Sequence, residues 1–228
     1  MKVVVSIGGS VLVPDEGSDR VDDYAGVLEA LEAAGHTTAA VVGGGPTARE
    51  DIAAARDHGA NEIELDQIGI AVTRLNARLL VAALGDRAAP TPPEGLEGAR
   101  EALRRGDLPV MGGTEPAHTT DAVAASLAEY ADADLLVLAT SVAGVYDADP
   151  DQYEDATKLD RCTTADLIDV VADIEMAAGS NAPVDLLAAK IIQRAGLRTA
   201  VVDGREPDNV RRAIEGDHEG TDVIPAGE

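Results

Sequence analysis

Three short apolar segments of this chain each end in a cluster of glycines, and this repetition constrains the fold more than any other feature. Each segment is apolar without polar alternation, which is typical of a strand buried on both faces. A stretch with helical spacing follows each cluster, so strands alternate with helices, and this predicts an α/β protein with a mainly parallel sheet covered on both faces. The segments are residues 2–7, 38–42 and 108–111, followed by Gly8-Gly9-Ser10, Gly43-Gly44-Gly45 and Gly112-Gly113-Thr114.

The rest of the chain continues the alternation. Further strands are predicted at residues 134–139 and 199–202, and residues 85–95 read as a loop around a short strand. The polar tail, residues 215–228, is expected to be loosely held, with 221–224 as a short edge strand. Helices are predicted at residues 22–34, 47–58, 66–84, 96–105, 121–130, 164–171, 184–195 and 207–214.

The charge balance is strongly acidic, with 18 basic against 42 acidic residues and a net charge of −24. Such a surface repels nucleic acids and anionic membranes, so neither is expected as a partner. Lysine is scarce, and Phe and Trp are absent. An acidic surface can serve solubility alone, but we favour adaptation to concentrated salt, in which carboxylates retain water and cations while exposed ion pairs are screened.

Length and cysteine content favour a cytoplasmic protein with one domain. The 228 residues suffice for one large α/β domain, and no apolar run approaches the roughly 18 residues that span a bilayer. The start is too short and too soon rich in glycine for a secretory signal. Cys162 is the only cysteine, so no internal disulfide can form, which suits a reducing cytosol.

The three glycine clusters predict a binding site for phosphates. The carboxyl ends of parallel strands share one edge of a sheet, and ligands bind in the crevice there. Glycines let the backbone turn its amides toward a ligand, and the helix N-termini that follow favour anions. A simpler explanation is that the glycines only make tight turns between strands and helices.

Several common motifs are missing from the chain. It has no G-x-x-x-x-G-K-[ST] sequence, which excludes a P-loop, and the Gly43 cluster lacks the third glycine of a dinucleotide site. It has no H-E-x-x-H sequence and no Cys/His cluster, so a transition-metal site would lack ligands and none is expected.

Two loops could contact a ligand in addition to capping a helix or making a surface turn. His118 lies in a loop that leads through Thr120 into a helix, and this loop either only caps the helix or also holds a phosphate or ribose. Tyr146 lies in a polar loop after the 134–139 strand, where a tyrosine can lie against a flat base or simply mark a surface turn.

Taken together, these segments resemble the amino-acid-kinase family, and within it the archaeal type of UMP kinase. The resemblance extends from residue 6 to residue 221, and its most specific parts are residues 112–125, 140–150 and 185–191. It implies a three-layer αβα sandwich, a UMP-binding lobe at about 1–115, an ATP-binding lobe at about 116–228, Mg²⁺ bound with ATP, and a homohexamer with the 66–84 helix at an interface.

The resemblance also implies binding residues. ATP phosphates would lie at Gly9, Ser10, Gly45 and Arg49, and adenosine at Thr140, Tyr146 and Asp149. UMP would lie at Gly44, Asp66, Thr114, Glu115, Pro116, Ala117, His118, Thr119 and Thr120.

One position departs from the family. Many members carry a lysine just before the first glycine pair, where this chain has Ser6. The catalytic charge is therefore assigned to Arg49, glycine amides, Mg²⁺ and Lys190, although Lys190 could simply be a helix residue that extends its amine to solvent.

The implied reaction is transfer of the γ-phosphoryl group of ATP to UMP, which relies on positioning and charge neutralisation rather than on a general base. Rival activities in the family are acetylglutamate, carbamate and isopentenyl phosphate kinases. A nucleotide-binding module without turnover and a Rossmann dehydrogenase are alternatives of other classes.

Overall fold

The computed structural model describes residues 1–15, 19–148, 150, 152–176 and 184–227. One seven-stranded sheet runs through the molecule in the order β3-β2-β1-β4-β6-β7-β5. All strand pairs are parallel except β6 with β7, so the predicted, mainly parallel sheet is confirmed. The strands are β1 Lys2–Ile7, β2 Thr37–Val42, β3 Val110–Met111, β4 Leu135–Thr140, β5 Arg161–Thr163, β6 Thr199–Asp203 and β7 Thr221–Ile224.

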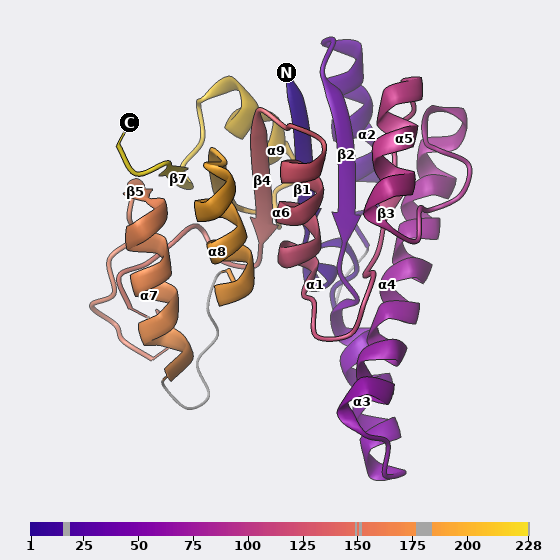
Figure 1. Ribbon diagram of the computed structural model, residues 1–228, viewed down its shortest axis with the longest axis horizontal. Helices are drawn as coiled ribbons and strands as arrows, with labels where there is room; N and C mark the ends of the chain where they lie inside the picture. Colours follow the sequence, from indigo (N-terminus) through magenta and orange to yellow (C-terminus); the bar gives the residue numbers. More distant parts are fainter. Residues whose placement is uncertain (16–18, 149, 151, 177–183, 228) are drawn as a thin grey trace.

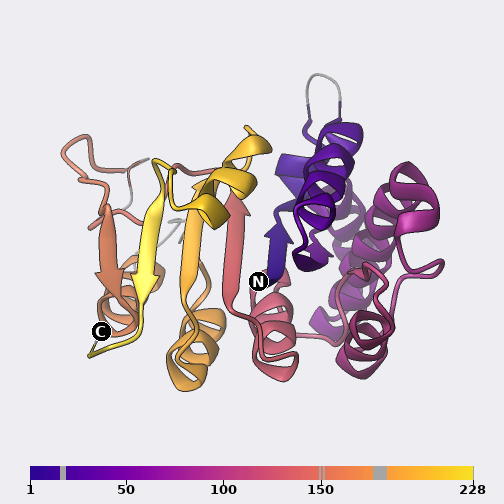
Figure 2. The same ribbon diagram turned by 90° about the horizontal axis from the view of Figure 1, so that it is seen from above.

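Helices cover both faces of this sheet, which confirms the three-layer αβα sandwich (Figures 1 and 2). One face carries α2 (Val21–Ala33), α4 (Glu62–Leu84) and α9 (Asp208–Glu215). The other carries α5 (Leu96–Arg105), α6 (Thr120–Tyr130), α7 (Thr164–Met176) and α8 (Leu186–Ala195). The short α1 (Gly9–Leu12), α3 (Gly45–Asp57) and the 3₁₀ turn η1 (Gly85–Arg87) complete the described elements.

The central strands supply both cores by simple alternation. Val3, Val5 and Ile7 of β1 pack into the core under α2 and α4, whereas Val4 packs into the core under α6. Successive side chains of a strand point to opposite faces, so an apolar segment without alternation fills both layers.

Helices α3 and α4 project beyond the carboxyl ends of the strands and flank that edge of the sheet (Figure 1). α4 begins with a capping box, in which Asn61 Oδ1 accepts from the Glu64 N–H and Glu64 Oε2 accepts from the Asn61 N–H. The cap starts the helix one turn before the predicted residue 66, because Glu62 and Glu64 favour a helix N-terminus.

The C-terminal tail is more ordered than the sequence predicts. β7 lies between β6 and β5 rather than at the edge of the sheet. Thr221 is fully buried, and its hydroxyl accepts from the Val145 N–H at 2.8 Å and donates to the Leu159 carbonyl at 2.5 Å. The predicted strand at 221–224 is confirmed, but its expected place at the edge and the loosely held tail are wrong. The three-residue β5, too short to show a pattern, forms the actual edge.

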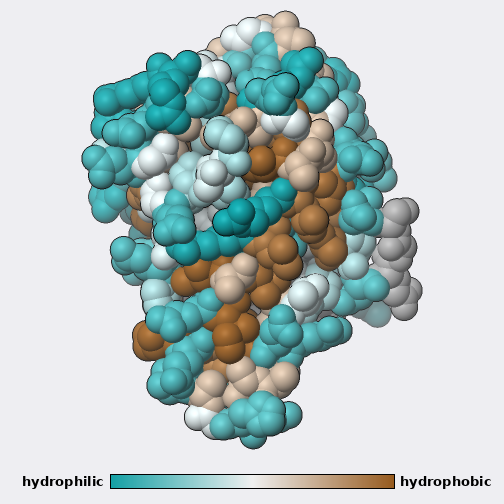
Figure 3. All heavy atoms as spheres, turned by 90° about the vertical axis from the view of Figure 1, so that its right-hand side faces the viewer, coloured by the Kyte–Doolittle hydropathy of each residue, from teal (hydrophilic) through white to brown (hydrophobic). Residues whose placement is uncertain are grey.

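α4 carries an apolar outer face. Leu75 and Leu79 have exposed fractions of 53% and 44%. In the side view of Figure 3, hydrophobic residues form a diagonal stripe across the side of the molecule where α3 and α4 lie. Among the described residues, Glu62–Arg87 alone is long and apolar enough to cross a membrane by those two criteria, but its inner face packs on α2, α3 and β3 as part of the sandwich.

Candidate active site

The first two glycine clusters are in direct backbone contact at the carboxyl edge of the sheet. A Cβ placed on Gly9 would lie 2.0 Å from the Gly45 nitrogen and 2.6 Å from the carbonyl carbons of Gly43 and Gly44. Gly45 adopts φ +67°, a left-handed conformation that suits glycine. Only residues without side chains fit here, so the two loops approach each other backbone to backbone.

Polar side chains of α4 hold the second and third clusters in place. Asn76 is buried and donates to the carbonyls of Gly43 at 2.8 Å and Gly44 at 3.2 Å. Thr73 Oγ1 accepts from the Gly113 N–H at 2.7 Å, and Arg74 Nε donates to the Gly113 carbonyl at 3.2 Å. The spacing of these residues on consecutive turns lets one rigid helix position both loops.

A cavity of about 320 Å³ lies between these elements. Its walls come from the start of α3, the first half of α4 and the loop before α6. Thr114 lines a neighbouring cavity of about 200 Å³ that shares Glu115 and His118, while Pro116 belongs to neither lining. Of the predicted residues, the larger cavity is lined by Gly44, Gly45, Arg49, Asp66, Glu115, Ala117, His118, Thr119 and Thr120.

Arg49 provides the positive charge of this cavity. It is the fifth residue of α3, and its described ion-pair partner is Asp15, with the Nη2 and Oδ2 atoms 3.7 Å apart. Its side chain is 63% exposed, so this pair contributes little to stability and leaves the guanidinium available to an anion.

The loop before α6 is tied to both neighbours. Asp66 Oδ2 accepts from the Ala117 N–H at 2.8 Å, which joins the loop to α4. Ala117 has φ +63°, an uncommon conformation for a residue with a Cβ. Thr119 caps α6 by accepting from the Ala122 N–H at 3.0 Å, and its hydroxyl also donates to Asp185. The loop therefore caps a helix and lines the cavity at once, so the two interpretations of its sequence do not compete.

Two carboxylates that sequence reasoning did not single out approach each other beside this loop. Ser6 is buried and donates to Asp121 Oδ1 at 2.7 Å. The pKa of Asp121 is raised to about 6, because burial and the negative charge of Asp185 raise it more than the hydrogen bond from Ser6 lowers it. Both aspartates lie within the most specific segments of the resemblance, residues 112–125 and 185–191, and that position was the available signal.

The remaining predicted residues lie outside this cavity. Thr140 and Tyr146 are half-buried at and after the carboxyl end of β4. Asp149 falls outside the described residues. Lys190 is exposed on α8 and is not among the residues that line the cavity.

The helix-covered, mainly parallel sheet with its glycine-lined edge defines an αβα-sandwich protein, and comparison places it in a family. The model of the Amino acid kinase family matches residues 1–203, so the chain belongs to that family. Uridylate kinase of Haloarcula marismortui is 66% identical over 226 residues, 99% of either chain. Uridylate kinase of Halobacterium salinarum is 60% identical over all of this chain and 95% of its own length.

Solved structures agree with the family assignment. The crystal structure of uridylate kinase from Archaeoglobus fulgidus is 44% identical with a TM-score of 0.89, over 98% of this chain and 100% of that one. Aspartate kinase from Synechocystis has a TM-score of 0.73 at 20% identity and shares the fold. The acidic, lysine-poor composition fits the haloarchaeal sources of the sequence relatives.

Proposed function

We propose that this chain transfers the γ-phosphoryl group of ATP to UMP, giving ADP and UDP. The observation that carries the proposal is the convergence of Gly44, Arg49, Asp66 and the 115–120 loop around one cavity, beside the contact between Gly9 and Gly45. The names of the haloarchaeal relatives, which match nearly the full chain, support UMP as the acceptor.

In this proposal the two nucleotides occupy different halves of one sheet. Residues 1–115 form the acceptor lobe, because α3 and α4 supply most of the cavity walls. Residues 116–228 form the ATP lobe, where Thr140, Tyr146 and Asp149 contact adenosine. The phosphates meet between the lobes, where Gly9 and Ser10 begin α1 and its amides face the crevice.

The reaction needs positioning and charge rather than a base. The acceptor phosphate has a second pKa near 6 and is largely ionised at pH 7. The cost is to bring two anions together in line, so Arg49 and the loop amides neutralise charge while α4 fixes the loops. Lys190 remains a predicted phosphate contact, although its exposed position on α8 would require the side chain to reach back toward the edge.

Mg²⁺ fits this arrangement as a partner of ATP. Among the described residues no group of three His, Cys, Asp or Glu side chains is placed to hold a metal ion. Mg²⁺ commonly binds through one or two carboxylates together with substrate phosphates, and Asp121 and Asp185 would supply the carboxylates. Bound there with ATP, the ion would screen the charge of the transferred group.

A coupled assay of ADP release in high KCl tests the proposed reaction. With Mg-ATP as donor, we expect turnover with UMP to exceed turnover with isopentenyl phosphate or acetylglutamate by at least about 100-fold, because a site that hydrogen-bonds its substrate discriminates strongly against ligands that leave its groups unpaired. CMP belongs in the same panel. Faster turnover of isopentenyl phosphate or acetylglutamate would contradict the proposal, and ADP binding without any turnover would favour a binding module.

We also propose that the enzyme works in the cytoplasm as a homohexamer in which the apolar outer face of α4 is an interface. The stripe in Figure 3 is larger than scattered single side chains, and contiguous apolar surface of this kind marks contact sites. The double substitution Leu75→Glu and Leu79→Glu is expected to reduce the particle mass by light scattering in high KCl. Leu187→Glu, at an exposed leucine of α8, serves as the control and should leave the mass unchanged. An unchanged mass in the double variant would exclude this face.

A further inference from the structure

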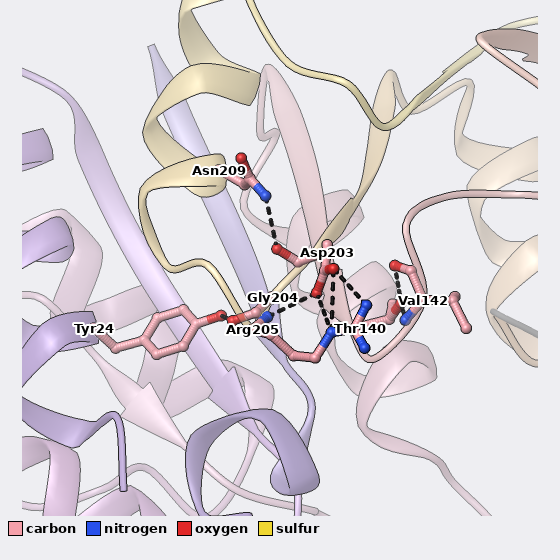
Figure 4. Close-up of polar contacts among 7 residues, drawn as sticks. All are labelled: Tyr24, Thr140, Val142, Asp203, Gly204, Arg205 and Asn209. Atoms are coloured by element: carbon pink, nitrogen blue, oxygen red, sulfur yellow. Dashed lines mark hydrogen bonds and ion pairs between the residues drawn. The ribbon is translucent and has the colours of Figure 1, made fainter. Parts of the chain in front are cut away.

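A tightly held turn at the carboxyl end of β6 carries an arginine that the proposed site does not use. Asp203 ends β6 and lies in register with Thr140 of β4, so the turn Asp203–Gly204–Arg205 borders the edge where the donor nucleotide is proposed to bind. In Figure 4 the Arg205 side chain extends from Gly204 toward Thr140 and Val142.

Hydrogen bonds fix the backbone of this turn from three sides. The Gly204 N–H donates to the Thr140 carbonyl at 2.7 Å, and the Gly204 carbonyl accepts from the buried Tyr24 hydroxyl at 2.8 Å. Asn209 donates to the Asp203 carbonyl at 3.0 Å. A Cβ on Gly204 would lie 2.8 Å from Val11 Cγ1 and 2.9 Å from the Ala139 carbonyl carbon, so the turn packs closely on α1 and β4.

Asp203 in turn fixes the guanidinium of Arg205. Nε lies 2.8 Å from Oδ1 and 3.1 Å from Oδ2, Nη2 lies 2.6 Å from Oδ2, and the Arg205 N–H donates to Oδ1 at 3.0 Å. Burial raises the pKa of Asp203, but the hydrogen bonds from Arg205 outweigh it and hold that pKa below its ordinary value. The carboxylate is therefore charged near neutral pH, and the arginine is oriented before any ligand arrives.

The guanidinium keeps donors for a ligand. Asp203 engages Nε and one hydrogen of Nη2, whereas Nη1 donates to no described residue. The Arg205 side chain is 55% exposed, so these hydrogens face solvent at the rim of the sheet. An exposed ion pair adds little stability. Stabilisation of the fold is therefore a poor explanation for why this turn is so well ordered.

The neighbours of the turn indicate which part of a nucleotide Arg205 reaches. Gly204 contacts Val11, the residue after Ser10, and Ser10 belongs to the proposed phosphate site. Tyr146, on the proposed adenosine side, lies close enough to Arg205 to interact with it electrostatically. The Arg205 turn thus lies between the residues proposed to hold the ATP phosphates and those proposed to hold adenosine.

We propose that Arg205 binds the polyphosphate of the donor nucleotide. The inference rests on the proposed function for the identity of the donor, and it assigns one of the few cations of the chain to the ATP lobe. A planar guanidinium with outward N–H groups matches phosphate oxygens and can make two parallel hydrogen bonds to them. Arg49 and Arg205 then neutralise the phosphates from opposite halves of the sheet.

Calorimetric binding of Mg-ADP and of adenosine to the full chain in high KCl tests this role. Arg205→Gln is expected to weaken Mg-ADP binding about 10- to 100-fold, the range for a lost charge-assisted hydrogen bond, and to change adenosine binding less than about 2-fold. The control is Arg211→Gln on α9, because Arg211 is also exposed and paired, with Asp208 and Glu215, but lies off the strand edge. That variant should bind Mg-ADP like the wild type.

Two results would overturn the inference. If a folded Arg205→Gln variant bound Mg-ADP with wild-type affinity, Arg205 would not contact the polyphosphate. If the variant lost Mg-ADP and adenosine affinity equally, Arg205 would contact the base or only hold the turn. A failure of the proposed function is measured separately, in the ADP-release assay. If the wild-type protein binds Mg-ADP but does not phosphorylate UMP, the proposed function fails while the binding test of Arg205 still applies.

Discussion

Replacing Gly9 by alanine is expected to abolish most of the activity and to destabilise the fold. The new Cβ would lie 2.0 Å from the Gly45 nitrogen, and the atoms it meets are backbone atoms that no rotamer change can move. The loops after β1 and β2 would have to separate, and a misplacement of about 1 Å at a catalytic site costs roughly 100-fold in rate. Overpacking of this kind costs about 1–3 kcal/mol of stability.

Gly26→Ala is the matched control for that substitution. Gly26 lies within α2, and a Cβ there has no atom within 4 Å. The change should raise the free energy of unfolding by about 0.5–1 kcal/mol, because alanine restricts the unfolded chain and favours helix, and it should leave turnover unchanged. Thermal unfolding and ADP release, measured on Gly9→Ala and Gly26→Ala, separate the effect of the backbone clash from the general effect of replacing a glycine. Near-normal turnover in Gly9→Ala would mean that the loop contact is dispensable.

Arg49→Ala is expected to lower kcat about 100- to 1,000-fold with no loss of folding stability. The loss follows from removing a preorganised donor to the transferred phosphoryl group in a strongly acidic protein. Stability should change by less than about 0.5 kcal/mol, because the exposed pair with Asp15 contributes little. Steady-state kinetics with Mg-ATP and UMP, together with thermal unfolding, measure both quantities.

Arg56→Ala provides the control on the same helix. Arg56 is two turns further along α3 and pairs with Glu62 at the surface, away from the residues that line the cavity. Its loss removes the same charge from the protein, so any general effect of net charge appears in both variants. Turnover of Arg49→Ala equal to that of Arg56→Ala would remove Arg49 from the mechanism.

Most of the fold follows from local pattern, and the exceptions have local reasons. The central strands are readable because β1, β2 and β4 are buried on both faces and contain no polar alternation. β5 is three residues long and shows no pattern, whereas the sequence predicts β7 as a strand but not its place, antiparallel to β6 and reached through α9. Their order depends on the buried Thr221 hydroxyl, which only the tertiary structure pairs with Val145 and Leu159.

The candidate site likewise has parts that the sequence predicts and parts that only the structure reveals. The glycine clusters and the 114–120 loop are visible as motifs, and the structure brings most of them to one cavity. The residues that hold them, Thr73 and Asn76, look like ordinary polar positions of a helix until α4 is seen against the loops. Asp203 and Arg205 were missed because an Asp-Gly-Arg turn has no distinctive spacing, and only its register with β4 marks it.

The backbone contact between Gly9 and Gly45, here called the seam, bears on how an enzyme of this kind adapts to concentrated salt. Amide dipoles belong to the main chain, and they persist whatever side chains the rest of the sequence exchanges. A lineage could therefore discard lysines and accumulate carboxylates over its whole exterior while the anion-gathering groups at this seam stayed the same. In this architecture, adaptation to salt changes side chains at the surface, whereas the proposed phosphate binding depends on main-chain atoms.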